Sequence, residues 1–350
     1  MQMQEALGRL AAGEHLSRDD MAAIVRRIMS GEATDAQIGG LLMALRMKGE
    51  TIEEIAGAAQ VMRAMAVAVP VGGKHLVDLV GTGGDGANLF NVSTAACFVV
   101  AAAGGRVAKH GNRAVSGSSG SSDVLEALGV PLDLSAGQVA RAIEEVGLGF
   151  MFAPAHHSAM RHALGPRREL GLRTLFNLLG PLTNPAGVRR QLIGVFDAAL
   201  CEPLARALKA LGSEHAMLVH ADDGLDEMSI AAPTQVVELK HGALSAYQIE
   251  PATLGMQADS LDGLQVDSAR ASARLIEAAF GRGEAPEHDV DKARRMIALN
   301  AGAAIYVAGL ARSIAAGVSM AEDLLCAGLA AEKLSAFVDL TQLMRASNPA

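Results

Sequence analysis

The chain has 350 residues, of which 50% are apolar, 19% are charged and only 3% are aromatic. So much apolar sequence excludes global disorder, and the scarcity of aromatic rings argues against an RNA-binding protein that stacks on bases. The formal net charge of −8 argues against general coating of nucleic acid, so an anionic ligand would need a local basic cluster.

Three cysteines, Cys97, Cys201 and Cys326, are too few for a disulfide framework and lack zinc-ligand spacing. We expect free thiols in a reducing compartment. Residues 1–10 show neither the basic nor the apolar region of a signal peptide. The longest apolar run, near 95–103, is far shorter than the roughly 20 residues of a membrane span. The sequence therefore predicts a soluble, cytoplasmic protein without membrane contact.

The first 70 residues predict a small helical domain. Apolar residues recur at helical spacing between residues 15 and 66, and three helix starts fit the capping-box spacing or its acidic variant: Ser17 with Asp20, Thr34 with Gln37, and Thr51 with Glu54. Because so small a helical unit would be marginally stable alone, we expect it to pack against another part of the chain.

After a linker at residues 70–73, the pattern changes to strands that alternate with helices, which predicts a mainly parallel central sheet flanked by helices. We expect strands at 76–80, 106–109, 147–152, 191–196 and 216–220, and helices at 91–103, 122–128, 138–146 and 198–211. Residues 236–239 and 246–249 predict an antiparallel edge hairpin. The last 80 residues read as mainly helical, with one helix beginning at Ser319 through Glu322.

A glycine-rich loop, Gly81-Thr-Gly-Gly-Asp-Gly86, follows the first strand. It matches the dinucleotide fingerprint formally, but residues 87–90 separate it from the next helix, and the following strand carries Arg106 and Lys109 where an acidic residue is expected. Two interpretations remain: a tight turn between strand and helix, or a cradle whose backbone N–H groups bind phosphate.

Two further segments have the composition of anion-binding loops. Asn91-Val-Ser-Thr94 precedes a helix, whose N-terminus either binds an anion or is simply capped by these side chains. Lys109-His-Gly-Asn-Arg113 supplies local positive charge after the next strand. The hydroxyl-rich residues 116–122 come after it, and we interpret them as a second anion-binding loop rather than a flexible linker.

The main acidic cluster, residues 221–227, follows another strand and contains adjacent Asp226 and Glu227. Carboxylates without Cys or His neighbours suit Mg²⁺ together with substrate phosphates, although an acidic surface turn is the alternative. His156-His157 is poor evidence for zinc. Of the arginines between 161 and 173, most would line a solvated helix face, and one could hold a carboxylate with both guanidinium nitrogens.

These motifs, taken in order, closely resemble the anthranilate phosphoribosyltransferase family. The resemblance covers nearly the whole chain and rests on GTGGDG at 81–86, NVST at 91–94, KHGNR at 109–113, GSSGSSDVLEALG at 117–129, RRELGLRT at 167–174, FNLLGPLTNP at 176–185 and DDGLDE at 222–227. One departure is Ser158, where the family usually has proline.

The resemblance implies an α/β fold with a small helical domain at 1–70, joined by helices from about 155–182, and a larger domain formed by 74–154 and 186–350. It implies a homodimer that transfers the 5-phosphoribosyl group of phosphoribosyl pyrophosphate to the amine of anthranilate in tryptophan biosynthesis, with two Mg²⁺ ions. An aromatic amine is already nucleophilic at neutral pH, so we expect no dedicated catalytic acid or base.

The resemblance also implies roles for individual residues. The residues expected to bind phosphoribosyl pyrophosphate are Gly81, Thr82, Gly84, Asp85, Asn91, Ser93, Thr94, Lys109 and Ser121. Those expected on the anthranilate side are Gly81, His110, Asn112, His157 and Arg167, and those expected to hold metal are Ser93, Asp226 and Glu227.

Three alternatives were weighed against this interpretation. A pyrimidine nucleoside phosphorylase on the same scaffold would leave the acidic DDGLDE segment unexplained. A nucleic-acid-binding relative would need a basic groove, which the charge of −8 disfavours. A dinucleotide-dependent enzyme lacks the expected acidic residue and helix start.

Overall fold

The computed structural model describes residues 1–114 and 118–347. Its N-terminal part is a helical bundle, as expected, of α1 (Met3–Ala11), α2 (Arg18–Met29), α3 (Asp35–Lys48) and α4 (Ile52–Met65). The three predicted caps are confirmed, because Ser17, Thr34 and Thr51 each accept a bond from the backbone N–H three residues on. The sequence analysis missed α1, which begins after Gln2 and buries Met3, Ala6 and Leu10.

A seven-stranded sheet forms the centre of the larger part, in the order β3-β2-β1-β4-β5-β6-β7. Its strands are β1 (Leu76–Gly81), β2 (Arg106–Gly111), β3 (Leu148–Phe152), β4 (Arg190–Gly194), β5 (His215–Ala221), β6 (Thr234–Lys240) and β7 (Ala243–Ile249). The first five strands are parallel, and β6 and β7 continue the sheet antiparallel. The predicted mainly parallel sheet with an antiparallel edge hairpin is therefore confirmed.

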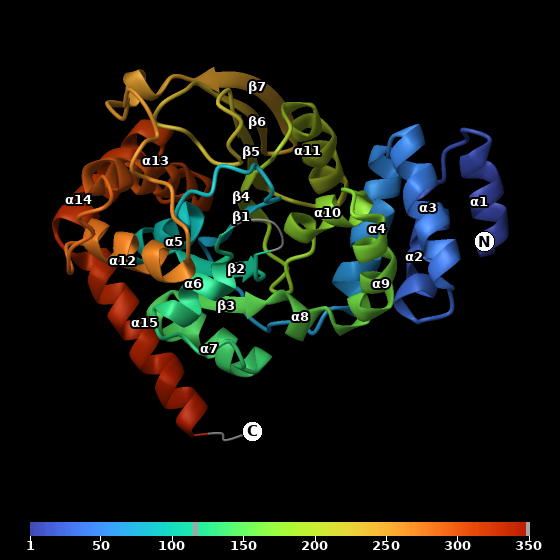
Figure 1. Ribbon diagram of the computed structural model, residues 1–350, viewed down its shortest axis with the longest axis horizontal. Coiled ribbons are helices and arrows are strands. Elements are labelled where there is room, and N and C mark those ends of the chain that lie inside the picture. The colour runs from blue at the N-terminus through green and yellow to red at the C-terminus, as the bar shows by residue number, and fades with distance from the viewer. Residues whose placement is uncertain (115–117, 348–350) are drawn as a thin grey trace.

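Helices flank this sheet, and a large hydrophobic core joins them to it. They are α5 (Val92–Ala102), α6 (Ser121–Ala127), α7 (Ala136–Val146), α11 (Cys201–Ala210), α12 (Ala269–Ala279), α13 (Val290–Ala308), α14 (Ile314–Cys326) and α15 (Leu329–Ala346). Figure 1 shows α5 and α12–α15 on the side of the molecule away from the N-terminal bundle. In the described part of the chain, no single helix is long and apolar enough to cross a membrane, although α14 and α15, which meet at a 71° bend, would pass that test together.

The predicted helix start at Ser319 is wrong. Helix α14 begins after Ser313, whose hydroxyl accepts a bond from the Ala316 N–H, and Ser319 lies inside the helix. A Cβ at Gly317 would lie 2.1 Å from the Gly302 carbonyl oxygen, so α14 crosses α13 at close range through its first turns. The tertiary contact with α13 therefore extends the helix upstream of the apparent capping box.

The bundle also includes a segment from the middle of the chain. After β3 come α8 (Ala153–His156), α9 (Arg161–Leu170) and α10 (Leu175–Leu179); α9 packs on α2 and α3, and α10 on α3 and α4. One hydrophobic cluster joins these helices to α11 and to β4 and β5. The bundle thus packs against the sheet part, as expected, and this packing supports our proposal that residues 155–182 belong with residues 1–70.

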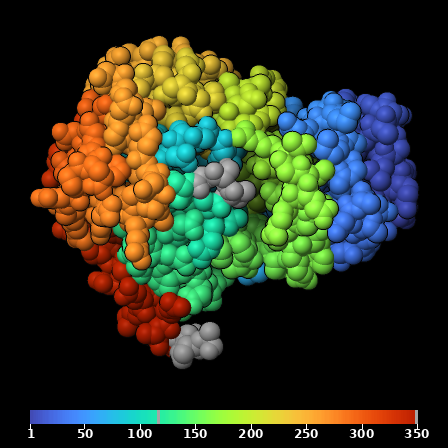
Figure 2. All heavy atoms as spheres, viewed as in Figure 1, coloured from blue at the N-terminus to red at the C-terminus, as the bar shows by residue number. Residues whose placement is uncertain are grey.

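Because five strands are parallel, the loops after them lie at one edge of the sheet. The chain leaves β1 toward β2 on one side, whereas β4 lies on the other side of β1. Such a reversal of strand order opens a crevice at the carboxyl ends of the strands, where open α/β sheets bind ligands. Figure 2 shows the surface hollowed between the segments that follow β1 and β2 and the green segment of α9 and α10.

Candidate active site

The glycine-rich loop leaves β1 at this crevice. Gly83, Gly84 and Gly86 have φ of 70°, 81° and 78°, which residues with a side chain rarely adopt. The Thr82 N–H donates to the Gly194 carbonyl (2.9 Å), and the Thr82 hydroxyl accepts from the Phe196 N–H (3.0 Å). The Thr82 side chain, predicted to bind substrate, is therefore already bonded to the end of β4.

The adjacent carboxylates Asp226 and Glu227 lie against this loop and the start of α5. The Asp226 carboxylate accepts a bond of 2.6 Å from the Gly83 N–H, and the Glu227 carboxylate accepts one of 3.2 Å from the Ser93 N–H. Burial, with the charge of Asp85, raises the pKa of Asp226 to about 7. Burial, with the charge of Asp226, raises the pKa of Glu227 to about 8. The structure thus concentrates acidic groups that a cation would stabilise.

Close backbone packing brings the acidic loop to this place. A Cβ at Gly194, the last residue of β4, would lie 1.5 Å from the Asp226 carbonyl oxygen, and one at Gly81 would lie 2.6 Å from an Asp226 carboxylate oxygen. Asn300 of α13, fully buried, bonds to both the N–H (3.0 Å) and the carbonyl (2.9 Å) of Met228. The sequence analysis missed Gly194 and Asn300, because neither stands in a motif with recognisable chemistry.

Lys109 provides a cation beneath the loop. It is 3% exposed, and its ammonium donates to the Leu79 carbonyl (2.7 Å) and to the Ser93 hydroxyl (3.3 Å). Its positive charge opposes the rise in the pKa of Glu227. Lys109, Ser93 and Glu227, which the sequence analysis assigned to one substrate and its metal, are therefore brought together.

Asn91 and Thr94 differ from simple capping residues. The Asn91 amide donates to the Ser119 carbonyl (3.1 Å), and its oxygen accepts from the hydroxyls of Ser119 and Ser272 (2.8 Å each). Asn91 therefore ties α5 to the loop before α6 and to α12 rather than capping α5. Thr94 is buried, and its hydroxyl has no hydrogen-bond partner among the described residues.

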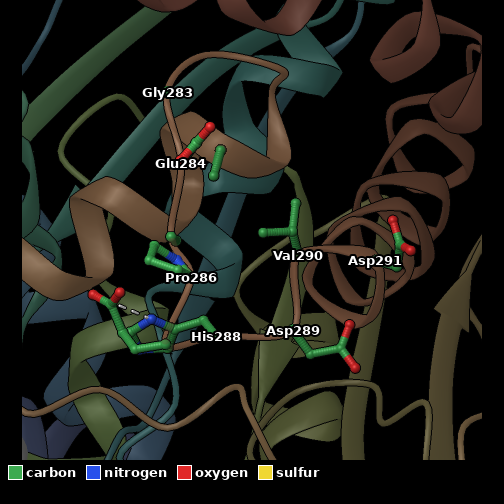
Figure 3. Close-up of a pocket in the computed structure, with 10 residues that line it drawn as sticks. Gly283, Glu284, Pro286, His288, Asp289, Val290 and Asp291 are labelled. Carbon is green, nitrogen blue, oxygen red and sulfur yellow. Dashed lines mark ion pairs between the residues drawn. The ribbon is translucent and has the colours of Figure 1, made fainter.

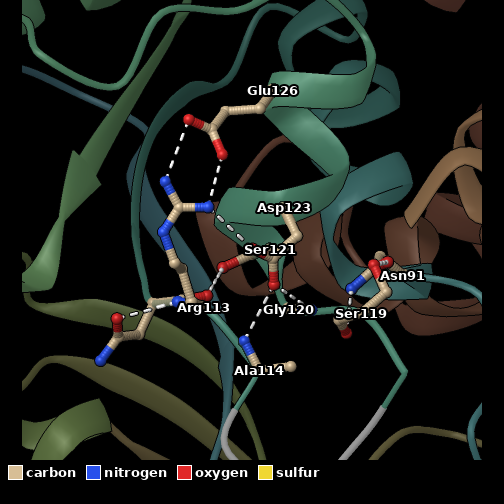
Figure 4. Close-up of polar contacts among 9 residues, drawn as sticks. Asn91, Arg113, Ala114, Ser119, Gly120, Ser121, Asp123 and Glu126 are labelled. Carbon is tan, nitrogen blue, oxygen red and sulfur yellow. Dashed lines mark hydrogen bonds and ion pairs between the residues drawn. The ribbon is translucent and has the colours of Figure 1, made fainter. Parts of the chain in front are cut away.

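The loop between β2 and α6 is fastened at both ends, as Figure 4 shows. The Asp123 carboxylate accepts bonds of 2.9 Å from the N–H groups of Ala114 and Gly120, and Arg113 bonds to Asp123 and to Glu126. The Ser121 hydroxyl donates to the Asn112 carbonyl (3.3 Å), which brings these two predicted site residues together. Residues 116 and 117 of the predicted anion-binding run lie outside the described residues.

Two buried histidines face each other, His110 near the end of β2 and His157 directly after α8. The ring centroids of His110 and His157 lie 5.1 Å apart, and neither Nε2 atom has a hydrogen-bond partner within 1–114 and 118–347. Burial, with the nearby histidines, lowers the pKa of His110 to about 3 and that of His157 to about 4. Both rings are therefore neutral at pH 7 and offer hydrogen bonds without charge.

Arg167 lies on α9, at the bundle side of the crevice. It is partly buried, its guanidinium lies over the ring of Phe176 (5.7 Å to the centroid), and burial lowers its pKa. The next residue, Arg168, is exposed. No hydrogen bond or ion pair in the described structure joins Arg167 to His110 or Asn112, so its place on the anthranilate side stays a prediction.

Two surface pockets lie beside α12. One, of about 680 Å³, is lined by Ala278 and residues 283–291, and Figure 3 shows the carboxylates of Glu284, Asp289 and Asp291 around it. Such acidic lining repels phosphate. The other, of about 540 Å³, includes Asn88 and Ser118 from the two loops described above.

Comparison with known proteins assigns the family. Residues 73–331 match the glycosyl transferase family a/b domain, and residues 4–66 match the helical bundle domain of the same family. The chain is 62% identical over 343 residues to the anthranilate phosphoribosyltransferase of Teredinibacter turnerae, a match that covers 98% of this chain and 100% of the relative. The chain belongs to the anthranilate phosphoribosyltransferases.

Solved structures of family members share the fold. The Thermus thermophilus enzyme superposes with a TM-score of 0.89 at 40% identity, covering 96% of this chain and 99% of that one. The Saccharomyces cerevisiae enzyme in complex with phosphoribosyl pyrophosphate and Mg superposes with a TM-score of 0.87 at 26% identity, covering 97% and 98%. The same yeast enzyme was also solved with 4-fluoroanthranilate (25% identity, TM-score 0.85, covering 97% and 99%).

Substitution of Gly194 by alanine tests the close packing at the carboxylates. The added Cβ cannot occupy a position 1.5 Å from the Asp226 oxygen, so the acidic loop must move. We expect Gly194→Ala to lose about 1–3 kcal/mol of stability, as overpacked sites do, and to weaken Mn²⁺ binding measured by electron paramagnetic resonance. Gly137→Ala, on an open surface of α7, is the matched control. Unchanged Mn²⁺ binding in Gly194→Ala would contradict this account.

Proposed function

We propose that this protein transfers the 5-phosphoribosyl group of phosphoribosyl pyrophosphate to the amine of anthranilate, releasing pyrophosphate, as a step of tryptophan biosynthesis. The observation that carries the proposal is the convergence of the glycine-rich loop, Lys109 and the Asp226–Glu227 pair at the carboxyl edge of a family-matched fold. We keep the homodimer and the cytoplasmic location as predictions.

In this proposal the loops after β1 and β2 bind the phosphoribosyl donor. Backbone N–H groups around Gly84 and Asp85, the start of α5 with Asn91, Ser93 and Thr94, and Ser121 at the start of α6 would meet its phosphates. Gly81 gives close access at the end of β1. Thr82 would hold the loop in place through its hydrogen bond to the segment just after β4. The positive charge of Lys109 would offset the negative charge of the acidic groups.

The residues present fit a hard divalent cation. Asp226 and Glu227 offer carboxylate oxygens with raised pKa values, and Ser93, whose N–H donates to Glu227, would add its hydroxyl. In the part of the chain that the structure describes, no three His, Cys, Asp or Glu side chains form a complete metal cluster, so substrate phosphates would complete the coordination. Bound Mg²⁺ would neutralise charge on the departing pyrophosphate. We keep two ions as the expected number.

On the acceptor side, His110, His157, Asn112 and Arg167 would position anthranilate. Neutral histidine rings can contact the aromatic amine without protonating it. The Arg167 guanidinium can bind the ortho carboxylate through two hydrogen bonds. The amine already has a free lone pair, so no general base is needed. The remaining contribution of the protein is to position both substrates and exclude water.

The direct test is fluorescence. Mixing the protein with anthranilate, phosphoribosyl pyrophosphate and Mg²⁺ should change anthranilate fluorescence as it is consumed, and the change should require all three components. The protein should not phosphorolyse pyrimidine nucleosides and should not shift single-stranded DNA in a gel. Phosphorolysis without anthranilate turnover would support the nucleoside phosphorylase alternative instead.

The acceptor assignment predicts a selective kinetic effect of Arg167. Losing a charge-assisted pair with the carboxylate should cost about 1.5–3 kcal/mol, so Arg167→Ala should raise the KM for anthranilate about 10–150-fold and change that for phosphoribosyl pyrophosphate little. Arg168→Ala, one residue further and exposed, is the control and should behave like the wild type. Equal effects of the two variants would overturn the assignment.

The metal assignment predicts a pH dependence that needs no substrate. Because the pKa values of Asp226 and Glu227 are raised to about 7 and about 8, ionising them destabilises the metal-free fold as pH rises from about 4 to 8. A cation that binds the ionised pair should therefore raise Tm more at pH 8.5 than at pH 6. Differential scanning fluorimetry with and without Mg²⁺ measures this.

The matched variant is Asp226→Asn with Glu227→Gln, which keeps both shapes and removes both ionisable groups. It should fold, lose the extra Mg²⁺ stabilisation at high pH, and have its largest activity defect at limiting Mg²⁺. The same pH-dependent Mg²⁺ effect in this variant would show that metal binds elsewhere.

A further inference from the structure

Arg173 contacts the glycine-rich loop from the bundle side of the crevice. It lies in the short connection between α9 and α10, its side chain is exposed, and its guanidinium donates to the Gly84 carbonyl. The same guanidinium lies over the ring of Phe196, with its central carbon 4.0 Å from the ring centroid, and makes a cation–π contact. Two partners of different kinds therefore fix the position of this side chain.

The Arg173 contact is one of two long-range holds on residues 83–86 of the loop. In the described structure, the other distant residue that holds these positions is Asp226, whose carboxylate accepts a hydrogen bond from the Gly83 N–H. Phe196, on which Arg173 stacks, also donates its N–H to Thr82. Arg173 and Phe196 therefore hold the loop through contacts that do not involve the acidic pair.

The helix just before this connection carries Arg167, the arginine predicted to lie on the acceptor side. Arg167 lies six residues earlier on α9, stacked on Phe176 of α10, and α9 packs on α2 and α3 of the bundle. Gly84 of the glycine-rich loop is thus joined through one guanidinium to the segment that follows Arg167. The described contacts join the two sides of the crevice at this point.

We propose that Arg173 is a positioning residue that couples the phosphoribosyl pyrophosphate site to the anthranilate site. Ordering of the glycine-rich loop by the donor fixes the Gly84 carbonyl, which fixes Arg173 and with it the α9–α10 connection. By linkage, a fixed acceptor site favours the ordered loop by the same factor. The inference rests on the proposed function, because it takes the glycine-rich loop as the donor site.

The test measures coupling without turnover. The probe for the acceptor site is 2-methylbenzoate, which keeps the carboxylate and an ortho substituent but has no nucleophilic nitrogen. Isothermal titration calorimetry gives its Kd in the absence and in the presence of saturating phosphoribosyl pyrophosphate and Mg²⁺. In the wild type the donor should tighten probe binding by at least about fivefold, the lower end of typical coupling between sites.

In Arg173→Ala, the Kd of the probe measured without donor should stay within about twofold of the wild-type value. Most of the tightening by the donor should be lost. Arg173→Lys, which can donate to one carbonyl but lacks the planar stack, should recover part of it. Phe196→Leu should lose part of the coupling while keeping its backbone bond to Thr82. Arg168→Ala is the control for loss of an exposed arginine nearby and should couple like the wild type.

Three results would overturn the inference: no tightening in the wild type, full tightening in Arg173→Ala, or an equal loss of probe affinity with and without donor. The last would make Arg173 an ordinary contact of the acceptor site. A wild type that binds neither the donor nor the probe would contradict the proposed function itself. That outcome differs from a loss of coupling between two sites that each still bind their ligand. A thermal unfolding measurement on each variant establishes that the variant is folded.

Discussion

The active-site arrangement depends on one close approach between backbones. The acidic loop after β5 passes so near the end of β4 that Gly194 cannot carry a side chain without a clash with the Asp226 backbone, and the Asp226 carboxylate lies against Gly81 at the end of β1. This approach places the Asp226 carboxylate on the Gly83 N–H, inside the glycine-rich loop. Buried Asn300 holds the same loop from behind, through its bonds to Met228. The carboxylates reach the glycine-rich loop because the backbone of the acidic loop packs directly on the end of β4.

The local arrangement of charge, rather than the net charge of the protein, decides what the crevice can bind. A chain with a formal charge of −8 would repel a polyphosphate, yet backbone N–H groups, a helix N-terminus and buried Lys109 gather at one edge of the sheet. The acidic pair adds charge of the wrong sign for phosphate, and burial together with neighbouring carboxylates raises the pKa values of both groups. A divalent cation resolves the conflict, since it binds both carboxylates and phosphates.

The helical bundle takes part in the site as well as in the core. Its helices share one hydrophobic cluster with α11 and the inner face of β4 and β5, so the two parts are packed against each other rather than tethered. The segment from α8 to α10 leaves the sheet part, joins the bundle and returns through Asn184, whose amide bonds to buried Asp78 and to the Ala108 carbonyl. The residues predicted to lie on the acceptor side therefore stand on elements anchored to both parts.

Much of this could be predicted from the sequence because the signals are local. A helix cap needs a side chain and an N–H three residues away, so Ser17, Thr34 and Thr51 were recognisable, as were the alternating strands and helices of the parallel sheet. Long ordered motifs then indicated the family and the candidate site residues. Local signals also misled: Ser319 has the capping spacing, but packing of Gly317 on Gly302 carries the helix through it.

Only the tertiary structure decided which of these residues meet, and through which partners. The sequence places Asn91 at a helix start, whereas the fold turns its side chain toward Ser119 and Ser272. Gly194 and Asn300 stand in no motif with recognisable chemistry, and nothing in the sequence distinguishes Arg173 from the arginines near it. Each of the three acts on a segment between 32 and 89 residues away, at a contact that exists only after packing. Local chemistry determines elements and loops, but the distance between two loops is set by how the whole core packs beneath them.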